Sequence, residues 1–338
     1  MSTMLPAPQA AVQELDAAPG GATGPIPALG VLPRRIGASG LRVHPVALGG
    51  NVFGWSVDDT TARRILDAFV DGGGTLVDTA DSYASGRSET MIGSWLAARG
   101  NRDRVVISTK VGKSAEHPGL SAKAITAAVD ASRQRLRVDT IDLLFLHIDD
   151  HSVEFEETLV AVDRLIRDGA VRAFGGSDHT GNRLIEARVA CGMLGVAPLV
   201  AVQNQYSLMH RREYETDLAH VAASQQLGVL PRFPLAAGYL TGKYRTRADL
   251  EASRRAGEVS RHFGRRGRRV IAVLDDVARA HGVPLGTIAI AWLLTKPNVV
   301  APIVSATSVE QVGAMLAAPT IQLTRSQVAE LDRASAGS

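Results

Sequence analysis

The sequence predicts an α/β protein folded as a (β/α)8 TIM barrel with a parallel, eight-stranded sheet. Eight short apolar segments alternate with segments of helical periodicity. Most of these short segments are apolar throughout, as expected for parallel strands that are buried on both faces. No G-x-G-x-x-G motif follows the first of them, which argues against a doubly wound dinucleotide-binding sheet. A chain of 338 residues can bury the core that such a barrel needs.

Two regions are expected along the chain, a flexible extension and a folded domain. Residues 1–33 are rich in Ala, Pro and Gly with little periodic apolar content, which predicts a flexible extension outside the fold. Residues 34–338 form the barrel domain. Its first residues, "RRIGASGLRVH", predict a hairpin with Gly40 in the turn that closes the bottom of the barrel.

The elements of the barrel follow in order. The eight expected strands are Pro45–Leu48, Thr75–Asp78, Val105–Thr109, Ile141–His147, Val171–Ser177, Val200–Gln205, Gly228–Phe233 and Val299–Ile303. Amphipathic helices between them are indicated by three apolar faces: Ile65, Leu66 and Phe69; Phe155, Leu159, Val162 and Ile166; and Val270, Val273, Leu274 and Val277. The final helix begins with a capping box, Thr324 with Gln327, and a hydrophobic staple between Leu323 and Val328.

The composition excludes several classes of protein. The net charge of +3 is mildly basic, and the basic run from Arg261 to Arg269 lacks the recognition module or stacking aromatics that nucleic-acid binding would need. The single cysteine, Cys191, excludes an internal disulfide and a cysteine metal cluster, so we expect an inert buried thiol and no metal. No apolar run approaches the ~20 residues of a membrane span, and no signal peptide is evident. A cytoplasmic protein that binds neither membrane nor nucleic acid is expected.

Polar residues gather where the predicted strands end. In a barrel, catalytic groups lie at the carboxyl ends of the strands. Those ends carry, in order, Gly49 to Asn51, Asp78, Lys110, His147, Ser177 with Asp178, Gln203 with Asn204, and Arg232 with Phe233. Tyr83, five residues after Asp78, can fold back over the mouth of the barrel. The sequence therefore predicts that Asp78, Tyr83, Lys110 and His147 form one catalytic site.

This set of four residues can donate a proton to an oxygen that gains negative charge. A tyrosine pKa of about 10 is too high for an efficient acid at neutral pH. An ammonium about 4 Å away, at an effective dielectric constant near 20, favours the phenolate by roughly 4 kcal/mol, which predicts a pKa about three units lower for Tyr83. Asp78 can keep Lys110 charged, and His147 can orient a carbonyl oxygen or share in proton transfer. A hydride donor would complete a carbonyl reduction.

Each residue also has a structural alternative. Asp78 and Asp81 could cap the following helix, and Lys110 could pair with a surface acid. His147 could be a hydrogen-bonded core histidine, and Tyr83 could be rim packing. The placement of all four on neighbouring strands favours the catalytic interpretation.

From about Arg34 to the last helix, the sequence resembles the aldo-keto reductase superfamily, (β/α)8 barrels that use a nicotinamide cofactor without a Rossmann domain. The similar motifs are "LRVHPVALGGNVFGW", "VDTADSYASGRSE", "VVISTKVG", "IDLLFLHIDD", "AVQNQYSLM", "PLAAGYLTGKY" and "APIVSATSVEQV". The resemblance implies that the catalytic tetrad falls on Asp78, Tyr83, Lys110 and His147, with Tyr83 as the general acid.

The resemblance also implies a cofactor site. Its contacts would come from Gly50, Asn51, Ser177, Asp178, Gln203, Arg232, Phe233, Pro234, Leu235, Gly238, Lys243, Ser305, Thr307 and Gln311. Asp178 stands where the family has an asparagine, and an ionised carboxylate can accept but cannot donate a hydrogen bond to the carboxamide. Arg232 stands where the family usually has an aromatic ring that stacks on the nicotinamide. We expect either that Arg232 turns toward an anionic substrate group or that Phe233 takes over the stacking.

The segment from Ser305 to Ser308 leads into a helix that begins near Val309. A capping box between Ser308 and Gln311 is its structural interpretation, and a cradle for the adenosine phosphate is its functional one. Most members of the family use NADPH, so the resemblance implies NADPH as the cofactor. No basic residue lies between Ile303 and Ala318, and Met315 occupies a position that often carries an adenine-contacting Asn, so NADH is the alternative.

The expected reaction is NAD(P)H-dependent reduction of an aldehyde or ketone in a small molecule. Pocket walls are expected from Phe53, Trp55 and Lys113, with His117 and Arg245 nearby, which would suit a sugar, a sugar nucleotide or a polyketide-like carbonyl. Three alternatives are an oxidative sugar dehydrogenase, a cofactor-binding regulatory protein, and a lyase or aldolase in which Lys110 forms a Schiff base. Oligomeric state is not readable from the sequence.

Overall fold

The computed structural model describes residues 31–251, 253 and 255–337. Most of the predicted extension, residues 1–30, lies outside the described residues. Of its last three residues, Val31 is buried and Leu32 is 83% exposed.

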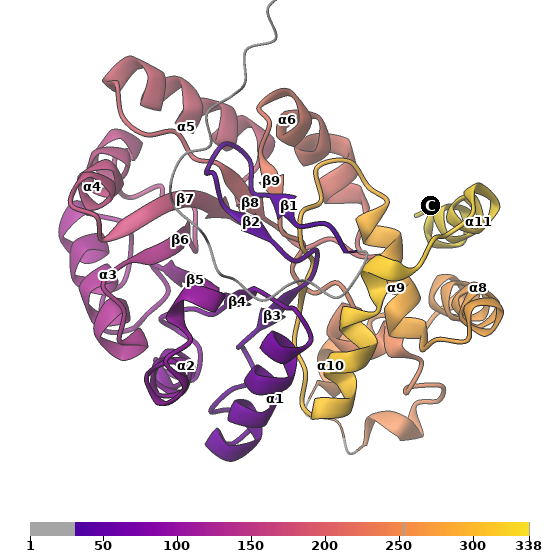
Figure 1. Ribbon diagram of the computed structural model, residues 1–338. Helices are drawn as coiled ribbons and strands as arrows, with labels where there is room; N and C mark the ends of the chain where they lie inside the picture. The colour runs from indigo at the N-terminus through magenta and orange to yellow at the C-terminus, as the bar shows by residue number, and fades with distance from the viewer. Residues whose placement is uncertain (1–30, 252, 254, 338) are drawn as a thin grey trace, which may run out of the picture.

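The eight strands form one parallel sheet, which confirms the predicted fold class (Figure 1). Their spatial order is β10-β3-β4-β5-β6-β7-β8-β9, so each strand from β3 onward lies beside the next strand in the chain. The strands are β3 (Ala47–Gly49), β4 (Leu76–Asp78), β5 (Val106–Val111), β6 (Ile141–Leu146), β7 (Val171–Ser177), β8 (Ala201–Gln203), β9 (Gly228–Val229) and β10 (Ile303–Val304). Because the strands are parallel, their carboxyl ends meet at one rim.

The last two strands differ from the prediction. β9 is shorter than expected, β10 shares only Ile303 with the predicted Val299–Ile303, and the two are joined by isolated hydrogen bonds. β9 ends two residues before Pro231, which has no backbone N–H to donate to a ladder. The remaining predicted residues still close the ring. Val300 N donates to Val229 O at 2.8 Å and Ile303 N donates to Pro231 O at 2.9 Å.

Helices surround the sheet (Figure 1). They are α1 (Asp59–Asp71), α2 (Arg87–Arg99), α3 (Ala122–Leu136), α4 (Phe155–Arg167), α5 (Gly181–Leu194), α6 (Ala219–Ser224), α7 (Ala256–Ser260), α8 (Arg265–His281), α9 (Leu285–Leu294), α10 (Val309–Leu316) and α11 (Arg325–Ser335). The predicted apolar faces of α1, α4 and α8 are buried, except that Ile166 and Val273 are only partly buried. Asp58, Ser121 and Thr180 cap α1, α3 and α5 by accepting a hydrogen bond from a backbone N–H of the first turn.

The predicted hairpin consists of β1 (Arg34–Arg35) and β2 (Arg42–Val43), and it crosses the barrel in Figure 1. Gly40, with φ of 77°, lies in its turn as expected. Ile36, Leu41 and Val43 are buried in one apolar cluster with residues from the amino ends of the strands, among them Ala47, Leu76 and Ala201. The hairpin therefore closes the end of the barrel opposite the rim where the polar residues gather.

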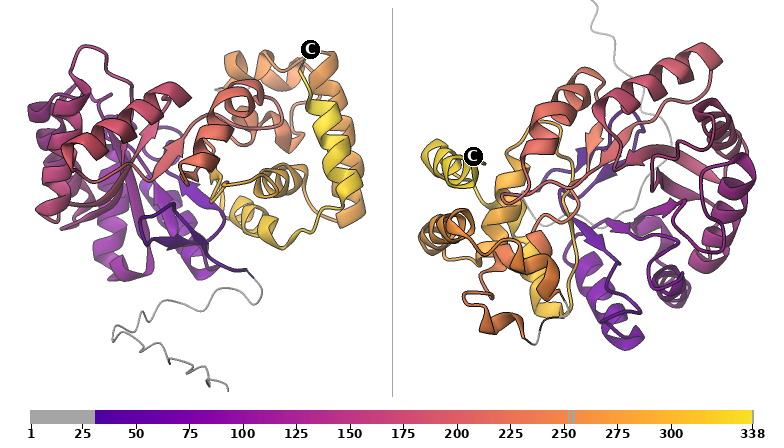
Figure 2. Two further views of the ribbon diagram at one scale, coloured as in Figure 1. Left: turned by 90° about the horizontal axis from the view of Figure 1, so that it is seen from above. Right: turned by 180° about the vertical axis from the view of Figure 1, so that it is seen from behind.

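The predicted final helix, α11, lies along α8 (Figure 2). Thr324 and Gln327 form the capping box at its start. At its end, Arg269 donates to Ala334 O at 2.9 Å and Arg266 donates to Ser335 O at 3.1 Å. Part of the basic run of α8 thus satisfies carbonyl groups that the last turn of α11 leaves without helical partners.

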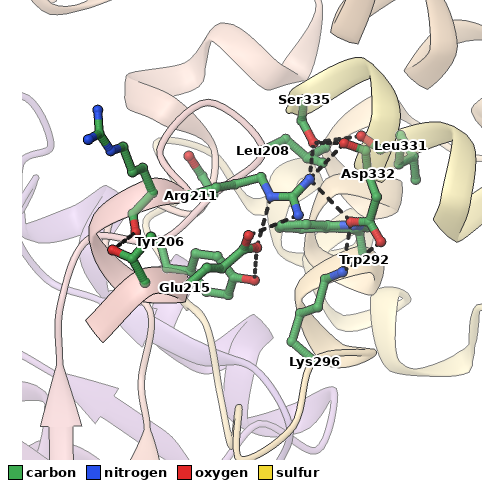
Figure 3. A network of polar contacts seen from close by, with 12 residues as sticks. Tyr206, Leu208, Arg211, Glu215, Trp292, Lys296, Leu331, Asp332 and Ser335 are labelled. Atoms are coloured by element: carbon green, nitrogen blue, oxygen red, sulfur yellow. Dashed lines mark hydrogen bonds and ion pairs between the residues drawn. The ribbon is translucent and has the colours of Figure 1, made fainter. Parts of the chain in front are cut away.

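A second network, formed by Arg211 and by residues of and after α9, also holds the last turns of α11 (Figure 3). Arg211 donates through Nη1 to the backbone oxygen of Asp332 and to Ser335 Oγ, both at 2.8 Å. Asp332 Oδ1 in turn accepts from Trp292 Nε1 at 2.9 Å and from Lys296 Nζ at 2.8 Å. Asp332 therefore joins α11 to α9.

Among the described residues, no single helix has the length and apolar character needed to cross a membrane. α8 and α9 satisfy that test of length and composition only as a pair, and 94° of bend separates their axes. Cys191 is a free, buried thiol, as predicted, and burial raises its pKa.

Candidate active site

Asp78 and Lys110 meet at the rim of the barrel, on neighbouring strands. Asp78 is the last residue of β4, and Lys110 lies near the end of β5. Lys110 Nζ lies 2.5 Å from Asp78 Oδ2 and donates to Thr79 O at 2.7 Å. Both side chains are buried, Lys110 to 1% exposure. The alternative in which Lys110 pairs with a surface acid is therefore wrong.

The second carboxylate oxygen of Asp78 is also occupied. Asp78 Oδ1 accepts from Ser108 Oγ at 2.6 Å and from Gln203 Nε2 at 3.1 Å. The carboxylate thus binds one ammonium and two neutral donors, so its position is fixed from β5 and β8. Gly86, not Asp78 or Asp81, is the N-cap of α2, so the helix-capping alternative for these two acids is also wrong.

Tyr83 reaches the same point from the loop that follows β4. The Lys110 Nζ atom lies 4.9 Å from the centroid of the Tyr83 ring, and the His147 ring lies edge-on to it at 6.1 Å between centroids. A turn of three left-handed residues, Ala84, Ser85 and Gly86, follows Tyr83. Gly86 N donates to Tyr83 O at 3.1 Å, which holds the backbone beside the phenol.

The ionisation of Tyr83 differs from the expectation. Burial raises the pKa of Tyr83, and the Asp78 carboxylate adds to this effect, while the Lys110 ammonium opposes it. The sequence predicted a lower pKa for Tyr83 from the charge of Lys110 alone. That prediction is wrong, because burial and the Asp78 carboxylate act in the opposite direction. Burial disfavours the Lys110 ammonium, but the charge of Asp78, the interaction with Tyr83 and the hydrogen bond to Asp78 together outweigh burial and raise the pKa of Lys110. Tyr83 therefore holds its proton and Lys110 holds its charge at neutral pH.

His147 is neutral in this arrangement. Burial, and then the charges of Lys110, Lys113 and Arg232, lower its pKa to about 2. Its Nδ1 atom is buried with no hydrogen-bond partner among the described residues, whereas the ring lines the cavity. The expected alternative of a hydrogen-bonded core histidine does not fit this geometry. A neutral imidazole can orient a carbonyl oxygen, but it cannot supply a proton as an imidazolium.

Asp81, which does not cap α2, is a further buried acid in the loop after β4. Its Oδ2 accepts from Gly112 N at 3.3 Å, and its Oδ1 has no partner among the described residues. Burial, and then the charge of Glu89, raise the pKa of Asp81 to about 6. Asp81 thus titrates near neutral pH while it is 2% exposed.

A cavity of about 780 Å³ extends from this tetrad to α10. Asp78, Tyr83 and His147 line it, whereas Lys110 lies behind them. The predicted cofactor and substrate residues that line it are Asn51, Trp55, Lys113, Asp178, Gln203, Arg232, Phe233, Pro234, Leu235, Gly238, Lys243, Ser305, Thr307 and Gln311. This volume falls within the range for small-molecule sites.

Besides Lys110, three residues predicted to contact the cofactor or substrate lie outside the cavity lining. Phe53 is fully buried in the apolar core. Gly50 lies against Ser88, where an added Cβ would come within 2.7 Å of the Ser88 hydroxyl oxygen. Ser177 is also buried, and its hydroxyl donates to Gln203 O at 3.0 Å. These residues support the lining from behind.

Other residues complete the cavity without having been predicted. Pro284, Gly286, Thr287 and Ile290 come from the start of α9, and Arg255 comes from the segment before α7. The Arg255 guanidinium lies 5.8 Å from the centroid of the Trp55 ring. No motif marks these residues, because their contribution depends on how α9 packs against the rim.

The α10 segment differs from the predicted capping box. Ser308 is the N-cap of α10 but accepts no hydrogen bond from the first turn. Gln311 instead accepts from the backbone N–H of Thr307 at 2.9 Å. Asn51 and Ser305 hydrogen-bond each other across β3 and β10. Ser305, Thr307 and Gln311 all line the cavity at the amino end of α10.

Asp178 and Arg232 form an ion pair at the opposite end, beside His147. Arg232 Nε and Nη2 lie 2.9 Å and 2.8 Å from Asp178 Oδ1. The Arg232 guanidinium carbon also lies 5.0 Å from the centroid of the Phe233 ring. Lys113 Nζ lies 3.8 Å from Asp178 Oδ2. Among the described residues, no group of His, Cys, Asp and Glu could hold a metal ion.

Comparisons with known proteins agree with this architecture. A family model described as "Aldo/keto reductase family" matches residues 45–336. The chain is 33% identical to the "Probable voltage-gated potassium channel subunit beta" of Arabidopsis thaliana, over 82% of this chain and 88% of that protein. It is 32% identical to the "Uncharacterized oxidoreductase YrpG" of Bacillus subtilis (86% and 91%) and 31% identical to "Norsolorinic acid reductase B" of Aspergillus parasiticus (88% and 82%).

Proposed function

The chain belongs to the aldo-keto reductase family, and we propose that it is an NAD(P)H-dependent reductase of aldehydes or ketones with Tyr83 as the general acid. The observation that supports this most directly is the joining of Asp78, Lys110, Tyr83 and His147 at one end of a cavity of about 780 Å³. The family match and the oxidoreductase relatives support carbonyl reduction in general.

The residues along the cavity fit a nicotinamide cofactor. The Gln203 amide nitrogen donates to Asp78, so its amide oxygen is the atom left to accept from a carboxamide. The Asp178 carboxylate offers a second acceptor. Ser305, Thr307 and Gln311 offer polar groups at the amino end of α10, where backbone N–H groups favour a phosphate. When bound, the cofactor supplies the hydride. NADPH is proposed because most members of the family use it, and NADH is the alternative.

The tetrad residues then have distinct roles. Tyr83 gives its proton to the carbonyl oxygen as negative charge develops there. The neutral His147 ring orients that oxygen. Lys110 lowers the free energy of the phenolate that remains, because its ammonium is the nearest positive charge, and Asp78 fixes Lys110 in place.

The Schiff-base alternative fits the geometry poorly. Lys110 is 1% exposed, donates to Asp78 and Thr79, and keeps its charge because Asp78 raises its pKa. A protonated, enclosed amine cannot attack a carbonyl. Borohydride treatment with a carbonyl substrate should therefore leave no adduct on Lys110.

A cofactor-binding regulatory protein is the second candidate. It is favoured by one observation, the 33% identity to a plant protein whose name describes a potassium-channel subunit. Such a protein would bind the cofactor without appreciable turnover. The oxidative direction on a sugar uses the same four side chains, so only kinetics in both directions can distinguish it.

The proposal is tested by following cofactor absorbance with a panel of aliphatic, aromatic and sugar carbonyls. We expect turnover with NADPH that depends on Tyr83. Tight cofactor binding with no turnover on any member of the panel would favour the regulatory candidate. A comparison of kcat/KM for NADPH and NADH decides the cofactor preference.

A further inference from the structure

Three charged side chains stand beside the tetrad, and of these only Asp178 has a role in the function proposed above. Lys113, Asp178 and Arg232 all line the cavity, and their side chains are 40%, 34% and 29% exposed. They follow β5, β7 and β9, so they gather from separate strands at the same rim. We refer to them as the charged trio.

The charged trio carries one positive charge in excess. The four tetrad residues contribute none, because Asp78 offsets Lys110 and because Tyr83 and His147 are neutral. Within the trio, two cations face a single carboxylate. The reacting end of the cavity is therefore positive before any substrate enters.

Both cations have donors to spare. Lys113 Nζ lies 3.8 Å from Asp178 Oδ2, which is too long for a hydrogen bond, and no closer acceptor is found among the described residues. Arg232 directs Nε and Nη2 at Asp178, so Nη1 has no acceptor within the described part of the chain. Burial lowers the pKa of Lys113, consistent with an ammonium that its single distant carboxylate compensates poorly.

The trio acts at the catalytic end of the cavity. Lys113, Arg232 and His147 line the same cavity. After burial and the charge of Lys110, the positive charges of Lys113 and Arg232 also contribute to the low pKa of His147. By contrast, the residues predicted to cradle the adenosine phosphate at α10 are neutral: Ser305, Thr307 and Gln311. The cations are thus suited to an anion on the substrate.

We propose that the substrate is an anionic carbonyl compound, an inference that rests on the function proposed above. Its carboxylate or phosphate binds Lys113 and Arg232 while its carbonyl group lies at Tyr83. Asp178 binds Nε and Nη2 of Arg232 and so fixes the orientation of the planar guanidinium group. The remaining nitrogen, Nη1, is left to bind the substrate anion. A compact oxyanion offers the several acceptors that an ammonium and a guanidinium require. Among the substrate classes expected from the sequence, this inference favours a sugar that carries phosphate, as a sugar nucleotide does, over a neutral sugar or a polyketide-like carbonyl.

The first test compares matched aldehydes that differ in charge. One pair is carboxybenzaldehyde, with the carboxylate para to the aldehyde, against its methyl ester. The other pair is glyceraldehyde 3-phosphate against glyceraldehyde. We expect the charged member to have the higher kcat/KM, and Lys113→Gln to reduce the charged-to-neutral ratio by about tenfold or more, mainly through KM. Lys123→Gln removes the same charge from an exposed position outside the cavity and should leave the ratio unchanged.

The second test needs neither cofactor nor turnover. Benzoate should raise the melting temperature of the full chain, benzamide should not, and the effect of benzoate should disappear in Lys113→Gln and weaken with added salt. The two aldehyde pairs show whether carboxylate or phosphate is preferred.

The outcomes separate the two proposals. Turnover of neutral aldehydes with no preference for their charged partners would overturn the anionic-substrate inference and leave the reductase intact. Benzoate binding that depends on Lys113, without turnover of any carbonyl, would support the anion site and reject the reductase. If benzoate also failed to bind, both would be rejected.

Discussion

Arg232 places two guanidinium nitrogens, Nε and Nη2, on a single oxygen of Asp178, although the two residues are 54 positions apart in the sequence. Asp178 adopts a left-handed backbone conformation, with φ of 59°, that aspartate tolerates better than most residues. The two departures from the family pattern are therefore partners in space. A lone guanidinium would repel the cationic ring of an oxidised cofactor, but Asp178 offsets that charge.

This pairing predicts non-additive effects on cofactor affinity. Arg232→Tyr alone leaves Asp178 with only the distant ammonium of Lys113. We therefore expect weaker binding of the reduced cofactor, whose ring is neutral and whose phosphates the Asp178 carboxylate repels. Asp178→Asn combined with Arg232→Tyr should recover most of the loss. Because both side chains are partly exposed, the coupling free energy should be about 1 kcal/mol. Fluorescence titration of the cofactor into the unmodified protein, Asp178→Asn, Arg232→Tyr and the double variant measures this coupling. If the two single substitutions changed the binding free energy additively, the pairing would be contradicted.

Replacement of Tyr83 by Phe removes only the phenolic oxygen. We expect kcat for carbonyl reduction to fall by about 10²- to 10⁴-fold, the usual contribution of a general acid. Cofactor affinity should change little, because the ring remains. Stopped-flow measurement of the reduction step, together with cofactor titration, checks both statements. Retained turnover in Tyr83→Phe would reject Tyr83 as the acid.

The buried ion pair predicts unequal stability effects. Lys110→Met leaves the Asp78 carboxylate buried without its counter-charge, so we expect a loss of about 3–5 kcal/mol in the free energy of unfolding. Adding Asp78→Asn removes the uncompensated charge and should restore much of that loss. Urea denaturation compares the single and double variants. If the double variant is no more stable than Lys110→Met, the pair does not govern stability.

Asp81 predicts a dependence of stability on pH. Its pKa rises from 3.8 to about 6 on folding, so the folded state binds the proton more tightly. The stabilisation is complete below pH 3.8 and is lost as pH rises through about 6. The difference, 6 − 3.8 = 2.2, corresponds to about 3 kcal/mol.

Asp81→Asn is the matched variant, because its amide can still accept from Gly112 N and does not ionise. Its free energy of unfolding should exceed that of the unmodified protein at pH 8, and the gap should shrink toward pH 4. Urea titrations across this range measure the gap. A gap that stays constant with pH would show that Asp81 does not titrate in the folded state as described.

Asp332 predicts the cost of detaching α11 from α9. Asp332→Ala leaves Trp292 Nε1 without its acceptor and Lys296 without its carboxylate, so a loss of about 1–3 kcal/mol in unfolding free energy is expected. Asp332→Asn keeps an acceptor for Trp292 and should cost less. Thermal or chemical denaturation ranks the two variants, and equal losses would indicate that the charge of Asp332 alone matters.

The barrel was predictable because its strands are short, mostly apolar segments that alternate with segments of helical periodicity. β7 spans the predicted residues, Val171–Ser177, and β4 and β6 differ by one residue at one end. β9 and β10 were less accurately predicted. Pro231 interrupts the first of them, and the closing contacts of Val299 and Val300 are made across the seam without a continuous ladder.

The site was predictable only in part. Strand ends in a parallel barrel share one rim, so the meeting of Asp78, Lys110 and His147 follows from topology. The protonation of Tyr83 does not follow, because it depends on how fully burial and Asp78 oppose Lys110. The Asp178–Arg232 pair depends on a left-handed residue and on side-chain direction, neither of which a single sequence reveals.

The hairpin at the amino end of the barrel has a practical consequence. Arg34 donates to Val299 O and Leu294 O, and the neighbouring Ile36 is buried beneath the sheet, so the chain enters the domain at its closed end. A carrier protein, affinity tag or solid support joined directly to Val31, in place of the residues before it, would attach at the back of the molecule. Small molecules would still diffuse freely to the open mouth, so Val31 is a suitable point for immobilisation.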